Sequence, residues 1–248
     1  MSVLAILHIL AALACGIHAV RTGQPIYWLL ILFMFPFLGS VVYGAAILLP
    51  ELRHSRGARQ ASRKVRAMLD PGRELREART AYEDAGSVVN RLRLADALVA
   101  DGKPADAVPL YEGALTGLYA EDPEILVRKA RALLESGRAG EAKATLDTLI
   151  AARPEFRSAA GHLTYARAVA AIGDRDRARE EFDVLVGYSP GLEARARYAT
   201  LLRDWGDTAR AREIAADAMR IASRLPAHSR AADREWIAAL QRVDRGGV

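Results

Sequence analysis

The stretch GRAGEAKATLDTLI, Gly137–Ile150, decides the fold, because close copies of it recur along the chain. The copies are GKPADAVPLYEGAL from Gly102, GDRDRAREEFDVLV from Gly173 and GDTARAREIAADAM from Gly206. Their glycines follow one another at intervals of 35, 36 and 33 residues. A period near 34 with helix-forming composition is typical of helix–turn–helix repeats, which bury their apolar faces only against neighbouring repeats. We therefore predict an all-α fold built as a solenoid of about four helix pairs.

Small residues at fixed offsets indicate where the helices of each pair meet. The glycine permits the tight turn between the two helices, and a small residue five positions later lets the second helix approach the first. The small residues expected at these contacts are Ala107, Ala142, Ala178 and Ala211 after the glycines, and Ala95, Ala130, Ala166 and Ala199 before them. On the same face of each second helix, four and seven positions beyond the alanine, come Tyr111 and Ala114, Leu146 and Leu149, Phe182 and Leu185, and Ala215 and Ala218. Pro154 and Pro190 follow the second and third pairs, where a helix has to stop.

With these positions, residues 88 to about 225 resemble the tetratricopeptide repeat family in four consecutive units. The family's early tryptophan is absent, the first unit has the longer exit TGLYAEDP before Pro123, and Ala215 stands where an aromatic is usual. Upstream, Ala78, Tyr82 and Ala85 repeat the second-helix spacing alone, as half a repeat would. Downstream, Ser229–Val243 is expected to be a capping helix with Trp236 and Leu240 against the last pair. The resemblance implies a right-handed solenoid over residues 71–248.

The first 50 residues have a different character, since Arg21 is their only formally charged residue. Val3–Val20 and Ile26–Leu49 are apolar runs of 18 and 24 residues, separated by the turn-like RTGQP. Helices of these lengths extend over about 27 and 36 Å, against a hydrocarbon core of about 30 Å. We predict a transmembrane hairpin over residues 1–50, with Pro36 and Gly39 kinking the second helix.

Two cleavable signals compete with this hairpin for the first apolar run. A secretory signal peptide would need a basic n-region, which MSVLAIL lacks. AALAC places the single cysteine, Cys15, after small residues as in a lipoprotein signal, but the second apolar run makes lipidation redundant. His8 and His18 are polar groups in apolar surroundings, so they are candidate sites in a membrane; packing inside the hairpin or near its interface is the favoured interpretation, since neither helix holds an acidic partner.

A basic linker, residues 51–70, separates the hairpin from the repeats. Its positive residues are Arg53, Arg56, Arg59, Arg63, Lys64 and Arg66, against Glu51 and Asp70. Such residues after a membrane helix are retained in the cytoplasm, which places both termini there and predicts a multi-pass protein of the bacterial cytoplasmic (inner) membrane. They also attract anionic lipid headgroups. The hairpin and this linker account for the whole net charge of +5, and the neutral remainder argues against nucleic-acid binding.

The run Trp28–Leu49 resembles the N-terminal membrane segment of cardiolipin synthases and related phospholipase D-like proteins, which has proline, glycine and tyrosine at similar spacing. Those enzymes need paired His-x-Lys-x-x-x-x-Asp motifs, and no histidine here has lysine two positions later. Phosphate-binding glycine loops, Cys-x-x-Cys pairs and histidine pairs at metal-ligand spacing are also missing from the sequence. We therefore expect no catalysis, cofactor or metal.

In the tetratricopeptide family, positions of each first helix line a concave groove that holds a peptide. The resemblance carries these positions to Arg93, Asp96, Glu124, Arg128, Arg131, Arg167, Arg197, Arg203 and Asp204. Either Asp96, Glu124 and Asp204 neutralise neighbouring arginines on a solvated face, or Arg128, Arg131 and Arg167 form a ladder that grips an acidic segment. The expected function is a membrane-anchored, non-catalytic scaffold that binds a protein or peptide partner. The alternative is a non-catalytic regulator of a membrane phospholipid enzyme, acting through the hairpin and the basic linker.

Overall fold

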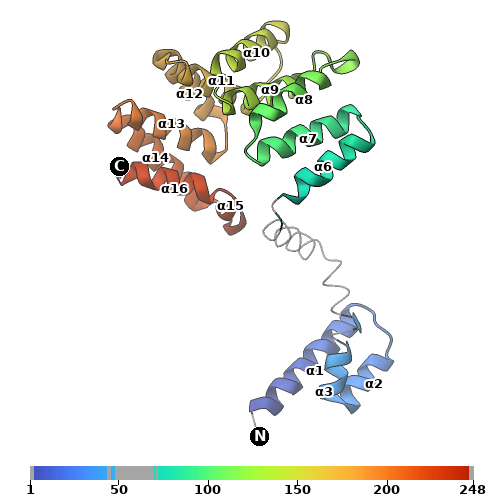
Figure 1. The fold of residues 1–248 in the computed structure, drawn as a ribbon. Coiled ribbons are helices and arrows are strands. Elements are labelled where there is room, and N and C mark those ends of the chain that lie inside the picture. The colour runs from blue at the N-terminus through green and yellow to red at the C-terminus, as the bar shows by residue number, and fades with distance from the viewer. Residues whose placement is uncertain (1–2, 44–45, 48–69, 71, 246–248) are drawn as a thin grey trace. The chain divides into compact units, whose positions relative to one another are not determined.

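The computed structural model describes residues 3–43, 46–47, 70 and 72–245, and every regular element within them is helical. The chain divides into two compact units, here called unit 1, residues 1–73, and unit 2, residues 74–248 (Figure 1). The basic residues predicted to contact lipid headgroups, from Arg53 to Arg66, lie outside the described residues. Each unit is therefore taken by itself.

The described residues of unit 1 form the α-helices α1 (Val3–Arg21), α2 (Tyr27–Met34) and α3 (Pro36–Tyr43). The prediction of one long helix over Ile26–Leu49 is wrong, because the chain leaves the helical conformation at Phe35 (φ −134°, ψ 73°). Proline has no amide hydrogen to continue the ladder and disfavours the helical conformation in the residue before it, so Pro36 ends α2 and begins α3. Of the helices in the described residues, none is both long and apolar enough to cross a membrane.

The two short helices fold back on each other and on α1. Gly39 allows this close approach, since a Cβ built there would lie 2.9 Å from the carbonyl oxygen of Ile31. Tyr43 at the end of α3 is fully buried against Trp28 at the start of α2, and its hydroxyl lies 3.0 Å from His18 Nδ1. The chain thus enters and leaves α2 and α3 beside the same end of α1. His18 is thus partly buried at the last turn of α1, whereas the side chain of His8 lies outside the described residues.

Unit 2 is a run of antiparallel helix pairs that follow one another along a curve (Figure 1). Within the described residues it begins with α6, where the sequence predicts the second helix of a half repeat, and continues with four pairs, the 3-10 helix η2 and the two C-terminal helices α15 and α16. The elements are α6 (Arg73–Asp84), α7 (Val88–Ala100), α8 (Pro104–Ala114), η2 (Gly117–Tyr119), α9 (Pro123–Glu135), α10 (Ala139–Ala152), α11 (Ala159–Ala171), α12 (Arg175–Tyr188), α13 (Leu192–Asp204), α14 (Thr208–Arg224), α15 (Ala227–Ala232) and α16 (Arg234–Asp244).

The predicted repeat register is confirmed at each pair. All four repeat glycines have φ between 76° and 93°, the left-handed region that an L side chain avoids. All eight alanines predicted at the helix contacts are fully buried. The residues four and seven positions beyond the alanine of each second helix are also fully or almost fully buried. Helices α10 and α12 end at Ala152 and Tyr188, two residues before the expected prolines.

Two apolar clusters share the core of unit 2 and meet in α11. The first runs from Ala78 to Leu149 and includes Ala168, whereas the second runs from Phe182 to Val243 and includes Ala166. Contacts between α12 and α13 are sparser than those between α8 and α9 or between α10 and α11. Phe182 and Tyr198 stack across this joint with ring centroids 5.0 Å apart.

The C-terminal cap differs from the predicted single helix over Ser229–Val243. The structure ends α15 at Ala232 and starts α16 at Arg234. Helix α16 packs against α13 and α14, with Leu240 fully buried and Trp236 partly buried against the second cluster. The cap is therefore real, but only its second half covers the last pair.

Candidate peptide-binding groove

The residues predicted to line the groove come from the first helix of each pair, and the structure gathers five of them in two cavities. The α6–α9 cavity, of about 480 Å³, contains Arg93, Asp96 and Arg128. The α11–α16 cavity, of about 370 Å³, contains Arg167 and Arg197. Arg131 and Arg203 lie on the same helices but outside the lining of both cavities.

In the α6–α9 cavity the predicted charges neutralise one another. Arg93 donates to Glu74 at 2.9 Å, and Arg128 lies 3.1 Å from Asp96. Asp96 also accepts a hydrogen bond of 2.7 Å from the hydroxyl of Tyr111. Burial, and then this bond to Asp96, raises the pKa of Tyr111 well above its usual range. The hydroxyl therefore stays protonated and holds Asp96 in place between two helix pairs.

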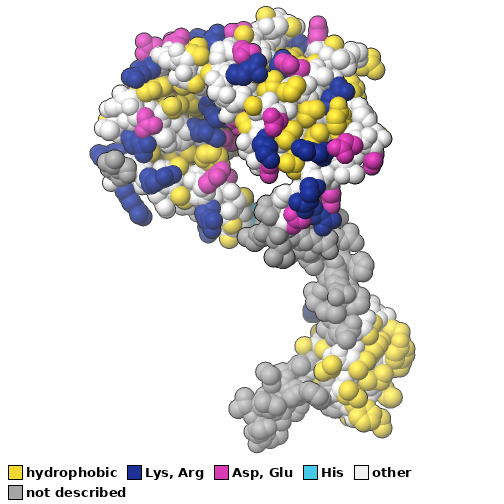
Figure 2. All heavy atoms as spheres, viewed as in Figure 1, with side chains coloured by type: hydrophobic (Ala, Val, Ile, Leu, Met, Phe, Trp, Pro, Cys, Tyr) yellow, Lys and Arg dark blue, Asp and Glu magenta, His cyan; other side chains and the backbone are white. Residues whose placement is uncertain are grey.

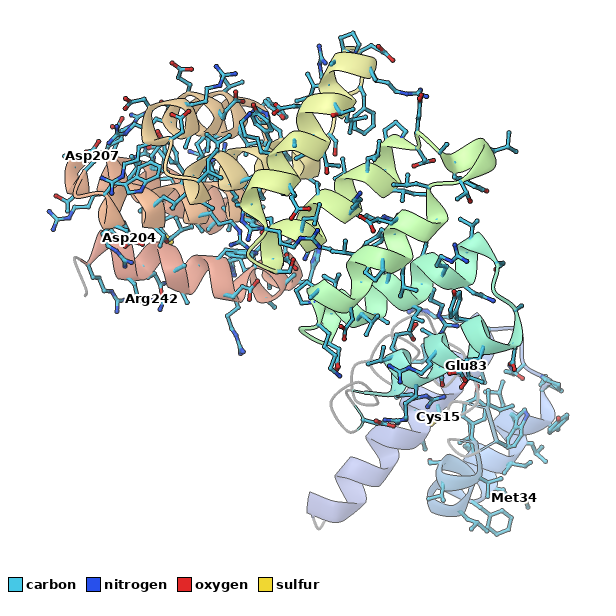
Figure 3. All side chains as sticks on the ribbon, turned by 45° about the horizontal axis from the view of Figure 1, so that its top comes forward. Cys15, Met34, Glu83, Asp204, Asp207 and Arg242 are labelled. Atoms are coloured by element: carbon cyan, nitrogen blue, oxygen red, sulfur yellow. The ribbon has the colours of Figure 1, made fainter. Side chains whose placement is uncertain are left out.

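Three further arginines are paired on their own helix. Arg131 donates to Glu135 and Arg197 to Glu193, both at 2.8 Å, and Arg203 contacts Asp204 at 2.7 Å. Asp204 lies at the end of α13 and Asp207 just before α14 (Figure 3). Exposed pairs of this kind contribute about 0–1 kcal/mol each. The predicted ladder of Arg128, Arg131 and Arg167 is thus not a row of three free cations.

Arg167 differs from the other groove arginines, since no described carboxylate lies within ion-pair distance of it. Burial, and next the charge of Arg197, lowers the pKa of Arg167, while Glu135 and Glu193 partly offset that effect from a distance. A guanidinium keeps its proton at such a position, so a partly desolvated positive charge stands in the α11–α16 cavity.

Trp236 forms a wall of the α11–α16 cavity. The sequence predicts this residue only in the capping helix. The guanidinium of Arg197 lies over its ring, 4.8 Å from the centroid, and Ala170, Ala171 and Ala196 contribute small side chains. A cavity with a cation beside an aromatic wall can receive a carboxylate that follows an apolar group. The amphipathic pattern of α16 predicts that Trp236 faces the solenoid. It does not predict which first helices the Trp236 ring contacts.

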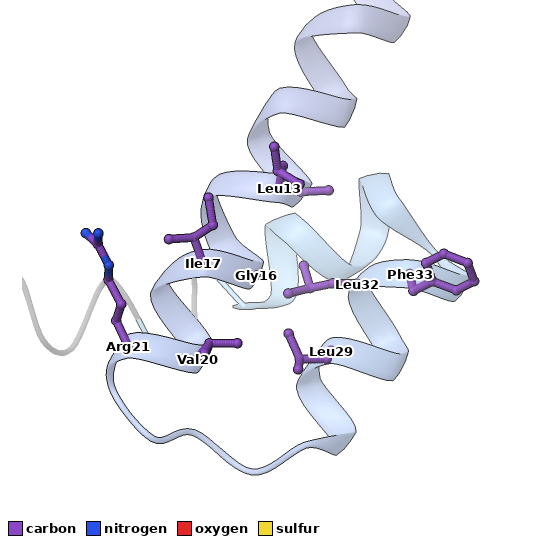
Figure 4. Close-up of a pocket in the computed structure, with 9 residues that line it drawn as sticks. Leu13, Gly16, Ile17, Val20, Arg21, Leu29, Leu32 and Phe33 are labelled. Carbon is purple, nitrogen blue, oxygen red and sulfur yellow. The ribbon is translucent and has the colours of Figure 1, made fainter.

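The visible surfaces of the two units differ in composition (Figure 2). Positive and negative side chains are interspersed over unit 2, and hydrophobic side chains gather on unit 1. Ile26 and Phe33 are 82 % and 91 % exposed. A cavity of about 670 Å³ between α1 and α2 is lined by Leu13, Ile17, Val20 and other apolar residues (Figure 4). Arg21, at the end of α1, is the charged residue of this lining (Figure 4).

No group of three or more potential metal ligands occurs among the described residues. The ion pairs and hydrogen bonds of the groove join helices or bind one helix to itself. Among the described residues that line it, the groove offers one cation without an ion-pair partner, Arg167, and the aromatic wall of Trp236.

A family model described as tetratricopeptide repeat matches residues 98–161, from the end of α7 to the start of α11. No curated protein matches the chain. The match lies within the region where the glycine register and the buried alanines were found. This part of the chain is similar to tetratricopeptide repeats, which generally mediate protein–protein interaction.

Proposed function

We propose that the protein is a non-catalytic scaffold whose first-helix groove binds a segment of another protein through a carboxylate of that segment. The observation that carries the proposal is the unpaired, partly desolvated Arg167 in the α11–α16 cavity. A charge that has lost part of its water and has no partner favours an incoming carboxylate, and guanidinium binds carboxylates with two parallel hydrogen bonds. Trp236 supplies apolar contact beside it.

The remaining groove arginines contribute differently, because each is already neutralised. Arg128 and Arg197 would have to exchange Asp96 and Glu193 for a partner's carboxylate, which gains little. They therefore shape the walls of the groove. We expect the acidity of the preferred partner to be concentrated at one residue.

A photo-cross-linking residue at Ala171, which lines the α11–α16 cavity, tests the proposal in cells that make the full chain. The matched control is the same residue at Ala144, an exposed position on α10. A partner captured from Ala171 and absent at Ala144 is the expected result. Arg167→Gln should then reduce the binding free energy of that partner by about 1.5–3 kcal/mol, the contribution of a hydrogen bond to a charged group. Added salt should reduce the affinity of the wild-type protein more than that of the variant. A partner that binds the variant with full affinity would place the site elsewhere.

Unit 1 is proposed to attach this scaffold to the bacterial cytoplasmic membrane. The support is chemical: among the described residues of this unit, the exposed side chains are mostly large and apolar, and Arg21 is the one formal charge in the sequence before Glu51. A soluble monomer rarely exposes an apolar surface of this extent. The basic residues from Arg53 to Arg66 favour the cytoplasmic side for the solenoid and for both termini.

Fractionation and reporter fusions test this attachment. The full chain should remain with membranes after a carbonate wash, and a fragment of residues 70–248 should be soluble. A reporter that works only in the cytoplasm should be active when it is fused at Val248. Activity there of a reporter that works only outside the cytoplasm would contradict the orientation. An external Met1 with a cytoplasmic Val248 would instead mean that α1 crosses alone, because α2 and α3 return to the same end of α1.

A further inference from the structure

A cavity of about 850 Å³ opens on unit 2 between the second helices α10 and α12. The first turns of α11 lie beneath it, through Gly161, His162 and Tyr165, and the connection after α10 closes one end. On α11, Arg167 and Ala170 line the α11–α16 cavity instead. The α10–α12 cavity is therefore distinct from the groove, and both can be occupied at once.

The side walls of this cavity are apolar and exposed. Ile150 of α10 is 54 % exposed, and Val184 and Tyr188 of α12 are 61 % and 54 % exposed. Phe156, in the connection after α10, is also among the lining residues. The two walls belong to neighbouring second helices, so the space between them is a trough that a third helix can occupy.

A hydrogen-bonded network holds the floor of the trough rigid. His162 lies 2.8 Å from the hydroxyl of Tyr188 through Nδ1 and 2.8 Å from Glu181 through Nε2. Glu181 in turn pairs with Arg177 at 2.5 Å. The rings of His162 and Tyr188 stack. Tyr188 is thus fixed in place although half of its surface is exposed, which lowers the entropic cost of covering it.

The charges at the two sides of the trough are unequal. Asp147 is neutralised by Lys143 at 2.7 Å, and Glu181 is neutralised by Arg177 and lies within hydrogen-bond distance of His162. Arg153 and Arg157, in contrast, stand in the connection after α10 without a carboxylate at ion-pair distance among the described residues. Arg157 donates to the carbonyl oxygens of Pro154 and Phe156 instead. Uncompensated positive charge thus gathers at one end of an apolar trough.

We propose that the α10–α12 cavity is a second docking site, which takes the apolar face of an acidic amphipathic helix from another protein. The apolar side chains of that helix pack between Ile150 and Val184, and its carboxylates lie beside Arg153 and Arg157. Charge complementarity selects this occupant over a basic one, and the length of α12 accommodates about four helical turns.

The test selects peptides from a displayed library of random peptides of about four helical turns, using the full chain in mild detergent as bait. Among the binders we expect acidic peptides with apolar residues at helical spacing. These should bind about tenfold or more weakly to Val184→Glu and to Ile150→Glu, because the new carboxylate would lose its hydration between apolar surfaces without gaining a partner. The double variant Arg153→Gln, Arg157→Gln should bind them more weakly and with less salt dependence.

Two controls separate this site from the groove and from general damage. Ile172→Glu changes an exposed apolar residue at the end of α11 and should leave binding intact, and so should Arg167→Gln. Melting curves check that each variant is folded, and Ile150→Glu replaces Val184→Glu if the latter is not. The proposal is overturned if no selected peptide loses affinity for Val184→Glu or Ile150→Glu. It is equally overturned if the peptides that lose affinity are basic. It is also overturned if the chain forms a dimer that Val184→Glu dissociates, since the occupant would then be a second copy.

Discussion

Ala142 shows how closely the helices of unit 2 approach, because its side chain is completely buried where α10 meets the preceding helix. Replacing it with leucine adds atoms where there is no free volume, and overpacking costs about 1–3 kcal/mol. Thermal melts of residues 70–248 should show Ala142→Leu several degrees below wild type. Ala144→Leu, two residues away and exposed, is the control and should melt with wild type. Equal midpoints for both variants would mean that the repeat register is wrong.

Gly137 and Gly140 lie three residues apart and should respond oppositely to alanine. Gly137 has φ +82°, which costs an L residue about 1–2 kcal/mol, whereas Gly140 lies in the first turns of α10 with open space around its Cα. Gly137→Ala should destabilise unit 2. Gly140→Ala should be neutral or stabilise it by up to about 1 kcal/mol. Urea denaturation of the two variants measures the difference, and the same sign for both would exclude this account.

The sequence predicted the contacts that repeat and missed those that do not. The buried alanines and the left-handed glycines were found because one spacing fixes them in every pair. The neutralisation of Arg128 by Asp96 and of Arg203 by Asp204 was predicted as one of two alternatives. The pairing of Arg93 with Glu74 was not, because these residues meet only across two helices. Arg167 stood out only after its neighbours were seen to be neutralised.

At the scale of the element, side-chain caps mark where several helices begin. The carboxylate of Asp122 accepts hydrogen bonds of 3.0 Å from the amides of Glu124 and Ile125 at the start of α9. Asp122→Ala removes the Oδ1 atom that accepts both hydrogen bonds and should cost about 1 kcal/mol, whereas Asp122→Asn keeps an acceptor oxygen and should cost less. Chemical denaturation of residues 70–248 compares them. An alanine variant as stable as the asparagine variant would show that the cap contributes nothing.

Hydropathy alone misjudged the second apolar segment. It measures how apolar a stretch is, so it joined α2 and α3 into one helix across Pro36. The structure instead uses the proline to reverse the chain, and Gly39 lets the two halves touch. The cap was misjudged for a related reason, since the break between α15 and α16 at Asp233 has no proline or glycine to mark it.

At the scale of the whole molecule, the two apolar clusters of unit 2 predict that its N-terminal and C-terminal helix pairs can be destabilised separately. Leu240→Ala empties part of the second cluster and should cost about 2–5 kcal/mol. Amide hydrogen exchange should then accelerate in α13, α14 and α16 and stay nearly unchanged in α7 to α9, because each repeat is stabilised by its neighbours. Leu133→Ala, in the first cluster, is the matched variant with the reverse pattern. Uniform acceleration in both variants would show a single cooperative unit.

The meeting of the two clusters in α11 also bears on how the chain folds while the ribosome makes it. Each helix of unit 2 packs mainly on helices adjacent in sequence, so its partners emerge soon after it, and local contacts of this kind form quickly. The first cluster can close once Ala168 has emerged, before α13 exists to compete for its surface. A nascent chain that ends with α12 therefore has a complete N-terminal core. The ring of Phe182 stays exposed in that chain until Tyr198, its stacking partner, has been made.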